Sequence, residues 1–311
     1  MPLRAFSLLA VVLASGAVGC GSSKVKRSIS GTGGVDGGAG IGGGSSGGAS
    51  GGGAGASGSG GVSGSSGASG ASGSAGAGGS DGGTATCPSG MVFGATNNFC
   101  IDSTEVPRVA YANWLAKSPS TAGQDTWCAF NQDFAPNSTS GDCTTAQFLD
   151  PLAPQNCVDW CDAFAYCKAA GRRLCGQIGG PGAVTQFNVT KADFSQWVNA
   201  CSDGGTRAHP YGAFQAGKCN DQTAGVAAPA KVPYKSGGCP GGVSGLYDMS
   251  GNVKEWVDSC TSSSESAQCF LLGGSYASST AATLQCTAAS SASRNANNLA
   301  DVGFRCCVDV P

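Results

Sequence analysis

Apolar residues recur at helical spacing in three stretches of the chain beyond residue 100. The first stretch follows Pro107, a residue that suits the first turn of a helix, and it places Tyr111, Trp114 and Leu115 on one face. The stretch ends before Ser118, which a second proline follows. This spacing predicts a short amphipathic helix.

The second stretch has clearer boundaries. Asp159 is a typical N-cap, and Trp160, Phe164 and Cys167 fall on one face of the helix that would follow it. Gly171 is a typical residue at a helix C-terminus. The pattern therefore predicts a helix that begins just after Asp159 and ends before Gly171.

The third stretch begins at Thr190, where Asp193 has the spacing of a capping box. A helix from Thr190 would carry four apolar residues on one face, namely Phe194, Trp197, Val198 and Cys201. Short strand-like runs, broken by Gly, Pro and Asn, lie at 91–93, 253–257, 270–272 and 303–308. Short helices beside many irregular strands indicate an α+β domain with long loops.

Cysteine is abundant and unevenly placed along the chain. Of the 17 Cys residues, 16 lie after residue 86, so their number there is even. In an exported chain such a set is typical of a disulfide framework, and clusters of metal-bound thiolates are the alternative. Cys306 and Cys307 are adjacent, and we expect them to pair with different partners.

Residues 1–19 have the pattern of an export signal. Arg4 precedes an apolar run at 6–13 that is too short to span a bilayer, and small residues then lead to Cys20. A cysteine at this position resembles the bacterial lipobox, which implies acylation of Cys20 and membrane anchoring through the lipid. Gly21 follows, which implies an outer-membrane or cell-surface lipoprotein, and ordinary secretion is the alternative.

Residues 20–86 are expected to form a disordered, lipid-anchored tether. Of the 53 Gly residues, 27 lie at 31–86, where Asp36 and Asp81 are the only charged residues. This composition buries too little apolar surface to offset the entropy of an ordered backbone. As a Gly/Ser coil, residues 31–86 have a root-mean-square end-to-end distance of about 40 Å. The folded domain is expected at 87–311.

Charge and histidine content exclude several classes of function. The chain has 17 basic and 19 acidic residues, so it lacks the basic footprint of a nucleic-acid-binding protein. His209 is the single histidine, which excludes a His-based iron or zinc centre. We interpret His209 as a turn residue with a locally hydrogen-bonded ring, and a catalytic base is the alternative.

Four blocks of sequence resemble one known family. They are FCIDSTEV at 99–106, VDWCDAFAYC at 158–167 with GRRL at 171–174, GLYDMSGNVKEW at 245–256, and GGSY at 273–276 with GFRC at 303–306. In this order they resemble the sulfatase-modifying-factor family, whose founding members are formylglycine-generating enzymes. The resemblance implies an irregular, C-type-lectin-like α+β fold, here disulfide-rich, over essentially all of 87–311.

The oxidase members of that family have two cysteines, five positions apart, between the motifs that correspond to GGSY at 273–276 and GFRC at 303–306. These cysteines bind copper and use dioxygen to convert a substrate cysteine to formylglycine. Here Cys286 alone lies in that interval, and Ala281 stands five positions before it. One thiol cannot form the thiolate pair that Cu(I) prefers, and the even cysteine count predicts that Cys286 is bridged. Cys286 is catalytic, with copper as cofactor, only if the chain is an oxidase.

The resemblance also implies one calcium site. Its ligands would be the carboxylates of Asp248 and Glu255 and the backbone carbonyls of Gly251 and Val253. Calcium takes six to eight hard oxygen ligands, which a glycine-containing turn between two carboxylates can supply. The alternative is a tight turn in which Asp248 accepts hydrogen bonds from backbone amides.

Three functions follow from these observations. The first is a non-catalytic surface module that binds an unidentified protein, peptide or glycan. The second is a formylglycine-generating oxidase that acts on exported sulfatase-like proteins. The third is a structural component of the cell envelope.

Overall fold

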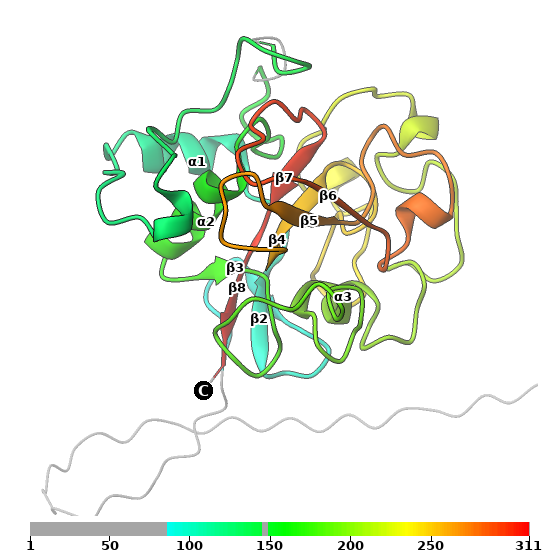
Figure 1. The fold of residues 1–311 in the computed structure, drawn as a ribbon. Helices are drawn as coiled ribbons and strands as arrows, with labels where there is room; N and C mark the ends of the chain where they lie inside the picture. The colour runs from blue at the N-terminus through cyan, green and yellow to red at the C-terminus, as the bar shows by residue number, and fades with distance from the viewer. Residues whose placement is uncertain (1–85, 145–148, 311) are drawn as a thin grey trace, which may run out of the picture. The chain divides into compact units, whose positions relative to one another are not determined.

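The computed structural model describes residues 86–144 and 149–310 (Figure 1). The predicted export signal, the predicted acylation site Cys20 and nearly all of the predicted tether lie outside the described residues. Within the described part, short helices and short strands alternate with long loops. The prediction of a disulfide-rich α+β domain is confirmed.

Two four-stranded sheets form the framework of the domain. The first has the order β1-β2-β8-β3 with antiparallel neighbours, and its strands are β1 (Met91–Phe93), β2 (Phe99–Asp102), β8 (Cys306–Asp309) and β3 (Arg173–Leu174). The second has the order β6-β5-β4-β7, and its strands are β6 (Ala289–Ser293), β5 (Gln268–Leu272), β4 (Lys254–Cys260) and β7 (Val302–Phe304). Strands β4 and β7 are parallel. Arg305 alone separates β7 from β8, so the chain passes from one sheet to the other at this residue.

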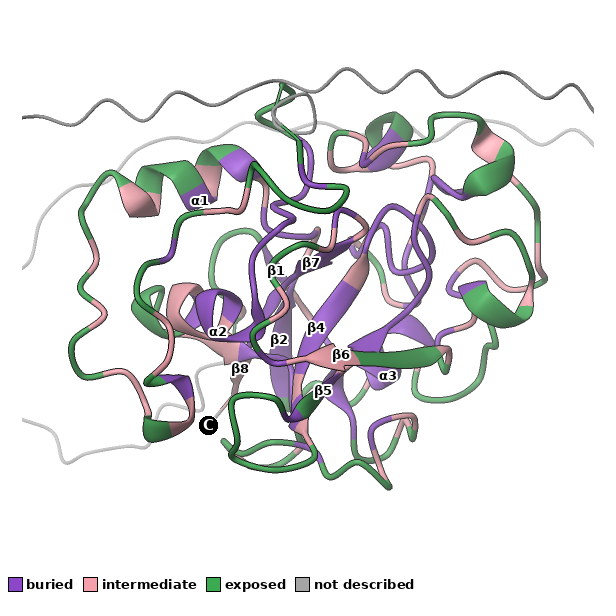
Figure 2. Cartoon of the chain, turned by 45° about the horizontal axis from the view of Figure 1, so that its top comes forward, coloured by how far each residue is buried: buried purple, intermediate pink, exposed green. Residues whose placement is uncertain are grey.

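The helices are α1 (Arg108–Leu115), α2 (Trp160–Ala169) and α3 (Gln196–Cys201), with 3₁₀ turns η1 (Thr126–Cys128), η3 (Gln222–Ala224), η4 (Tyr234–Ser236) and η5 (Ala282–Leu284). In the views of Figures 1 and 2, α1 and α2 lie on one side of β4 and α3 on the other. The predicted α1 and α2 are confirmed. Asp159 caps α2 in a reciprocal capping box with Asp162.

The predicted start of the third helix at Thr190 is wrong. Residues 190–195 form turns, and α3 begins at Gln196 with Ser195 as its cap, because the Ser195 hydroxyl accepts a hydrogen bond from the Val198 amide. The side chain of Phe194 is therefore outside the helix and 42% exposed rather than part of its apolar face. Ser195, two residues before the buried Trp197, is the better start signal.

The strand predictions hold in position but not always in length. The run at 91–93 is β1, and 270–272 is part of the longer β5. The run at 253–257 begins one residue before β4 and ends three residues before its last residue. The run at 303–308 is two strands, because Arg305 interrupts it. Strand β6 was not predicted, since its sequence of Ala and Ser lacks apolar alternation, and pairing with β5 fixes it instead. Figure 2 shows this strand largely exposed, whereas β2 and β4 are buried.

Eight disulfides join all sixteen cysteines from Cys87 onward. The pairs are Cys87–Cys100, Cys128–Cys161, Cys143–Cys157, Cys167–Cys306, Cys175–Cys307, Cys201–Cys286, Cys219–Cys239 and Cys260–Cys269. Cys306 and Cys307 have different partners, as predicted. A framework of this density is typical of an oxidising, extracellular environment. No helix of the described residues has the length and apolar character needed to cross a membrane.

Candidate functional site

Cys286 follows η5 and is bonded to Cys201 at the end of α3, with an S–S distance of 2.06 Å. Both residues are fully buried. A thiolate is the nucleophilic and copper-binding form of cysteine, and a bridged sulfur is neither. Ala281 lies in the same segment and has no side-chain group that could bind a metal. The structure therefore confirms that Cys286 is bridged.

His209 holds this same segment in place. Its ring Nε2 lies 2.9 Å from the backbone carbonyl of Ala281, and the ring stacks on Tyr211 with centroids 5.8 Å apart. Its hydrogen-bond partner is 72 residues away, so the expected local hydrogen bond is replaced by a long-range one. His209 is 4% exposed, and its ring connects its own loop to the segment that contains Ala281.

Four charged side chains meet in the interior between the two sheets. Glu105, Glu255 and Arg305 have no exposed surface, and Asp248 is 1% exposed. The Arg305 guanidinium donates to both oxygens of Glu255, over 2.7 Å from Nε and 2.9 Å from Nη2. It also donates to the backbone carbonyls of Asp102 and Tyr247, 3.0 Å in each case. Arg305, in the fourth block of sequence, thus contacts the first block at Asp102 and the third block at Tyr247 and Glu255.

The three carboxylates of this cluster have different partners. Glu255 Oε2 accepts a second hydrogen bond from the Trp197 indole over 2.9 Å. Asp248 faces the amide of Tyr234, with its nearer oxygen 3.0 Å away. Glu105 Oε1 accepts from the Asn252 amide group over 3.1 Å, but its Oε2 has no hydrogen-bond partner among the described residues. That oxygen lies 3.7 Å from the Arg305 guanidinium.

Burial dominates the electrostatics of the cluster. It raises the pKa of Asp248 from 3.8 to about 7. It also raises the pKa of Glu105 well above its ordinary value, and the nearby Asp248 charge raises it further. Burial acts to lower the pKa of Arg305, but the surrounding carboxylates outweigh it, so the pKa is raised and the guanidinium keeps its charge. With every carboxyl group ionised, three negative charges would face one positive charge.

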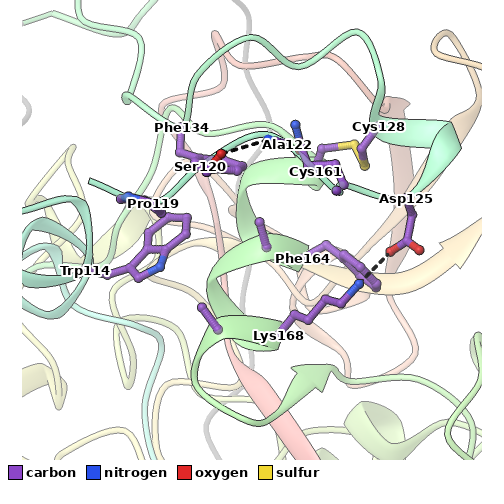
Figure 3. Close-up of a pocket in the computed structure, with 14 residues that line it drawn as sticks. Trp114, Pro119, Ser120, Ala122, Asp125, Cys128, Phe134, Cys161, Phe164 and Lys168 are labelled. Atoms are coloured by element: carbon purple, nitrogen blue, oxygen red, sulfur yellow. Dashed lines mark hydrogen bonds and ion pairs between the residues drawn. A yellow bond between two sulfur atoms is a disulfide. The ribbon is translucent and has the colours of Figure 1, made fainter. Parts of the chain in front are cut away.

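A pocket of about 210 Å³ opens between α1, α2 and the loop that joins α1 to η1. Its lining is mainly apolar and includes Trp114, Pro119, Phe134, Phe164 and the Cys128–Cys161 disulfide. Figure 3 shows Phe164 and Lys168 on the same side of α2, with Trp114 and Pro119 across the pocket. At the rim, Lys168 Nζ lies 3.2 Å from the Asp125 carboxylate.

Sequence reasoning placed Trp114 and Phe164 on inward helix faces, and both are half-buried at this pocket rather than sealed in the core. It missed Glu105 and Arg305 as members of the buried cluster. A signal existed for both, because each belongs to a block that carries the family resemblance. Asp248 and Glu255 both contribute to the charge around Arg305, whereas the calcium site predicted at these two residues stays a prediction.

Comparison with protein families decides the identity of the domain. The model for the sulfatase-modifying factor enzyme 1-like domain matches residues 91–310, which is most of the chain. The chain belongs to this family. The resemblance read from the four blocks of sequence is thereby confirmed for the sulfatase-modifying-factor domain.

Several solved structures are similar to this sulfatase-modifying-factor domain. The structure of PvdO from Pseudomonas aeruginosa is 17% identical, with a TM-score of 0.47, and the match covers 68% of this chain and 80% of that chain. The crystal structure of CarF is 17% identical, with a TM-score of 0.44 over 68% of this chain and 87% of that chain. Treponema denticola variable protein 1 is also 17% identical, with a TM-score of 0.42 over 68% and 84%. No curated protein sequence matches the chain.

The carboxylates of the cluster in this sulfatase-modifying-factor domain are the type of donor that a hard cation takes. Glu105 Oε2 is a buried anionic oxygen without a hydrogen-bond partner in the described part of the chain. Glu255 Oε2 already accepts two hydrogen bonds, whereas Oε1 accepts one and retains a lone pair. Gly251 and Asn252 both have positive φ angles, of 102° and 60°, so the turn between Asp248 and Glu255 is tightly curved. No group of three or more His, Cys, Asp or Glu side chains with metal-binding geometry occurs in the described residues.

Proposed function

We propose that this chain is an exported, lipid-anchored surface protein whose sulfatase-modifying-factor domain binds a protein partner and does not catalyse oxidation. One observation carries the non-catalytic part of the proposal: the sulfur of Cys286 is bonded to Cys201 in the buried interior. The family oxidases need two thiols in that interval, and this chain has one cysteine there. A domain that retains the family scaffold without the reactive pair is suited to binding.

The pocket between α1 and α2 supports a binding role. Its apolar lining and single ion pair at the rim are typical of a site that receives an apolar side chain beside a polar group. The Cys128–Cys161 disulfide at this pocket connects η1 to α2. A pocket held in this way is preorganised, which lowers the entropic cost of binding.

Counting free thiols tests the non-catalytic assignment. The purified full-length protein is alkylated without reduction, digested and weighed. We expect no label on any cysteine from Cys87 onward. In parallel, a peptide containing Cys-x-Pro-x-Arg is incubated with the protein, copper and dioxygen, and we expect its mass to stay unchanged. Loss of sulfur from the peptide would instead establish the oxidase, and alkylated Cys286 would remove the observation on which the non-catalytic assignment rests. Peptide and glycan arrays test the binding role. A protein that binds nothing on either array would favour the structural role in the envelope.

We also propose that calcium binds at Asp248 and Glu255, with the carbonyls of Gly251 and Val253 as further ligands. The bound ion would supply positive charge to a cluster with excess carboxylates. Because a ligand that binds only the folded state stabilises it, a chelator should lower the melting temperature of the protein. Asp248→Asn should abolish the difference between calcium and chelator. An unchanged melting temperature in the unmodified protein would exclude the site.

Anchoring through Cys20 is tested in the cell. The unmodified protein should incorporate labelled fatty acid and fractionate with membranes, whereas Cys20→Ser should be released in soluble form. Protease added to intact cells should remove the domain of the anchored protein if it lies at the surface. Soluble unmodified protein without a lipid would favour ordinary secretion.

A further inference from the structure

Strand β1 presents an unpaired backbone edge. It is the outermost strand of its sheet and pairs with β2 alone. The bonds that flank the pairing run from the Gly94 amide to Phe99 (3.0 Å) and from the Ser103 amide to Gly90 (2.9 Å). In an antiparallel ladder, hydrogen-bonded pairs alternate along the strand, so residues 90, 92 and 94 face β2. The backbone groups of Met91 and Phe93 therefore point away from the sheet.

Three of these outward groups have no partner in the described part of the chain. The Met91 amide donates to the Pro88 carbonyl over 3.0 Å. The Met91 carbonyl and the Phe93 amide and carbonyl accept or donate no hydrogen bond within residues 86–144 and 149–310. An unpaired strand edge is a template for another strand, and natural proteins often protect such edges with charged residues or proline. Residues 91–93 contain neither.

A groove of about 750 Å³ runs along this edge. Five successive residues, 91–95, line one side of it. Because side chains alternate between the two faces of a strand, an unbroken run of lining residues indicates that the groove follows the edge and not one face. The opposite wall consists of Asp203, Arg207 and residues 242–244.

We propose that this groove binds an extended segment of a partner protein, which adds to the sheet as a strand beside β1. The proposal rests on the proposed binding function in taking the ligand to be a protein. The unpaired backbone groups argue for this occupant, since amides and carbonyls in alternation are what a second strand offers. Asp203 and Arg207 pair with each other over 3.1 Å, so the wall has no net charge and suits an uncharged segment. The ring of Phe93 favours a β-branched or aromatic residue opposite it.

Hydrogen exchange of the Phe93 amide in the free full-length protein tests whether the edge is open. We expect this amide to exchange quickly, in contrast to the Val92 amide, which faces β2. Protection of Phe93 at every protein concentration would mean that the chain itself fills the groove. Protection that grows with concentration would mean that a second copy fills it. Either result would overturn the proposal.

A pair of peptides then tests the backbone recognition. The probe is a blocked peptide of about seven residues with alternating valine and threonine between terminal lysines. The matched control has the same sequence, with every second backbone amide N-methylated to remove the donors on one edge. We expect the probe to slow exchange at Phe93 by at least about tenfold and to bind at least about tenfold more tightly than the control. Equal affinity of the two peptides contradicts strand addition.

Two sets of variants locate the binding site. Phe93→Pro removes the outward amide, whereas Phe93→Ala retains it. The probe and its N-methylated control should therefore bind the proline variant equally, whereas the alanine variant should still bind the probe more tightly than the control. Ser244 is exposed at the groove, and Ser244→Trp should block the peptide without disturbing the core. Ser290→Trp on β6, also exposed but at the other sheet, should leave binding unchanged. Unimpaired binding by a folded Ser244→Trp variant would exclude the groove.

The thiol count of the unmodified protein separates this proposal from the proposed function. If the thiols are all bridged and the peptide does not bind, the groove is wrong and the non-catalytic assignment stands. If Cys286 carries a free thiol while the probe pair behaves as expected, the groove stands and the non-catalytic assignment fails.

Discussion

An ion pair between a basic and an acidic side chain occurs both in the buried cluster around Arg305 and at the pocket between α1 and α2. The two pairs differ in their exposure to solvent. In the cluster, Arg305 and Glu255 are sealed from solvent and held by two hydrogen bonds to each other. At the pocket, Lys168 and Asp125 form an ion pair with side chains 60% and 31% exposed. Water screens the second pair and not the first. Removing one partner should therefore lower the free energy of unfolding far more in the cluster than at the pocket.

The largest expected effect comes from removing the positive charge of the cluster. Arg305→Met leaves Glu105, Asp248 and Glu255 without their buried counter-ion, and loss of one partner of a buried ion pair costs about 3–5 kcal/mol. Urea unfolding of the variant measures the loss. Lys168→Met, which breaks an exposed pair with Asp125, is the control and should cost less than about 1 kcal/mol. Equal losses would show that burial does not separate the two kinds of ion pair.

A slightly smaller effect is expected at the disulfide that closes the site of the family thiols. The double variant Cys201→Ser, Cys286→Ser opens a loop of 85 residues and should lose about 2–5 kcal/mol of unfolding free energy. The matched variant Cys260→Ser, Cys269→Ser opens a loop of 9 residues and should lose less, since shorter loops restrict the unfolded chain less. Denaturant unfolding of both variants at one pH compares them. The reverse order would contradict the loop argument.

The third effect is a pH dependence that belongs to the cluster. Burial raises the pKa of Asp248 from 3.8 to about 7, so the folded state holds a proton that the unfolded state releases from about pH 4 upward. The free energy of unfolding should therefore fall as the pH rises from about 4 to 7. Glu105 acts in the same direction, as do Asp102, Asp159 and Asp258, each with a pKa raised to about 6 by burial.

Melting temperatures in chelator between pH 5 and pH 8 measure this slope, which Asp248→Asn should reduce. Saturating calcium should also flatten it, because a bound cation favours the charged carboxylate. An identical slope in chelator, in calcium and in the Asp248→Asn protein would show that Asp248 causes neither the pH dependence nor the effect of calcium on it.

The smallest effect on stability is expected at the pocket. Lys168→Met should change the free energy of unfolding by less than about 0.5 kcal/mol, because the Asp125 pair is largely exposed. Indole serves as a small apolar probe of the pocket, and NMR shifts of the pocket residues measure its binding. Phe164→Ser should weaken this binding, since Phe164 forms part of the apolar wall. Phe194→Ser, an exposed aromatic away from the pocket, is the control. Indole binding that survives Phe164→Ser would place the small-molecule site elsewhere.

Much of the fold was predictable because its signals are local. Asp159 and Gly171 bound α2 in sequence as they do in the structure, and the adjacent Cys306 and Cys307 have different partners, as expected from their positions. Strand β6 was not predictable, since nothing in its Ala and Ser residues distinguishes it from a loop until β5 lies beside it. The start of α3 failed because two capping signals, at Thr190 and Ser195, compete, and the turn at 190–195 decides between them.

The candidate sites divide in the same way. The family resemblance of the block at 245–256 implied that Asp248 and Glu255 share a site, and residue order alone showed that no cysteine stands five positions before Cys286. The pairing of Cys286 with Cys201, the insertion of Arg305 among three carboxylates and the free edge of β1 depend on contacts between residues far apart in the chain. Spacing fixes which residues can cap, turn or alternate, but burial and long-range pairing decide which charges are paired and which groups stay open.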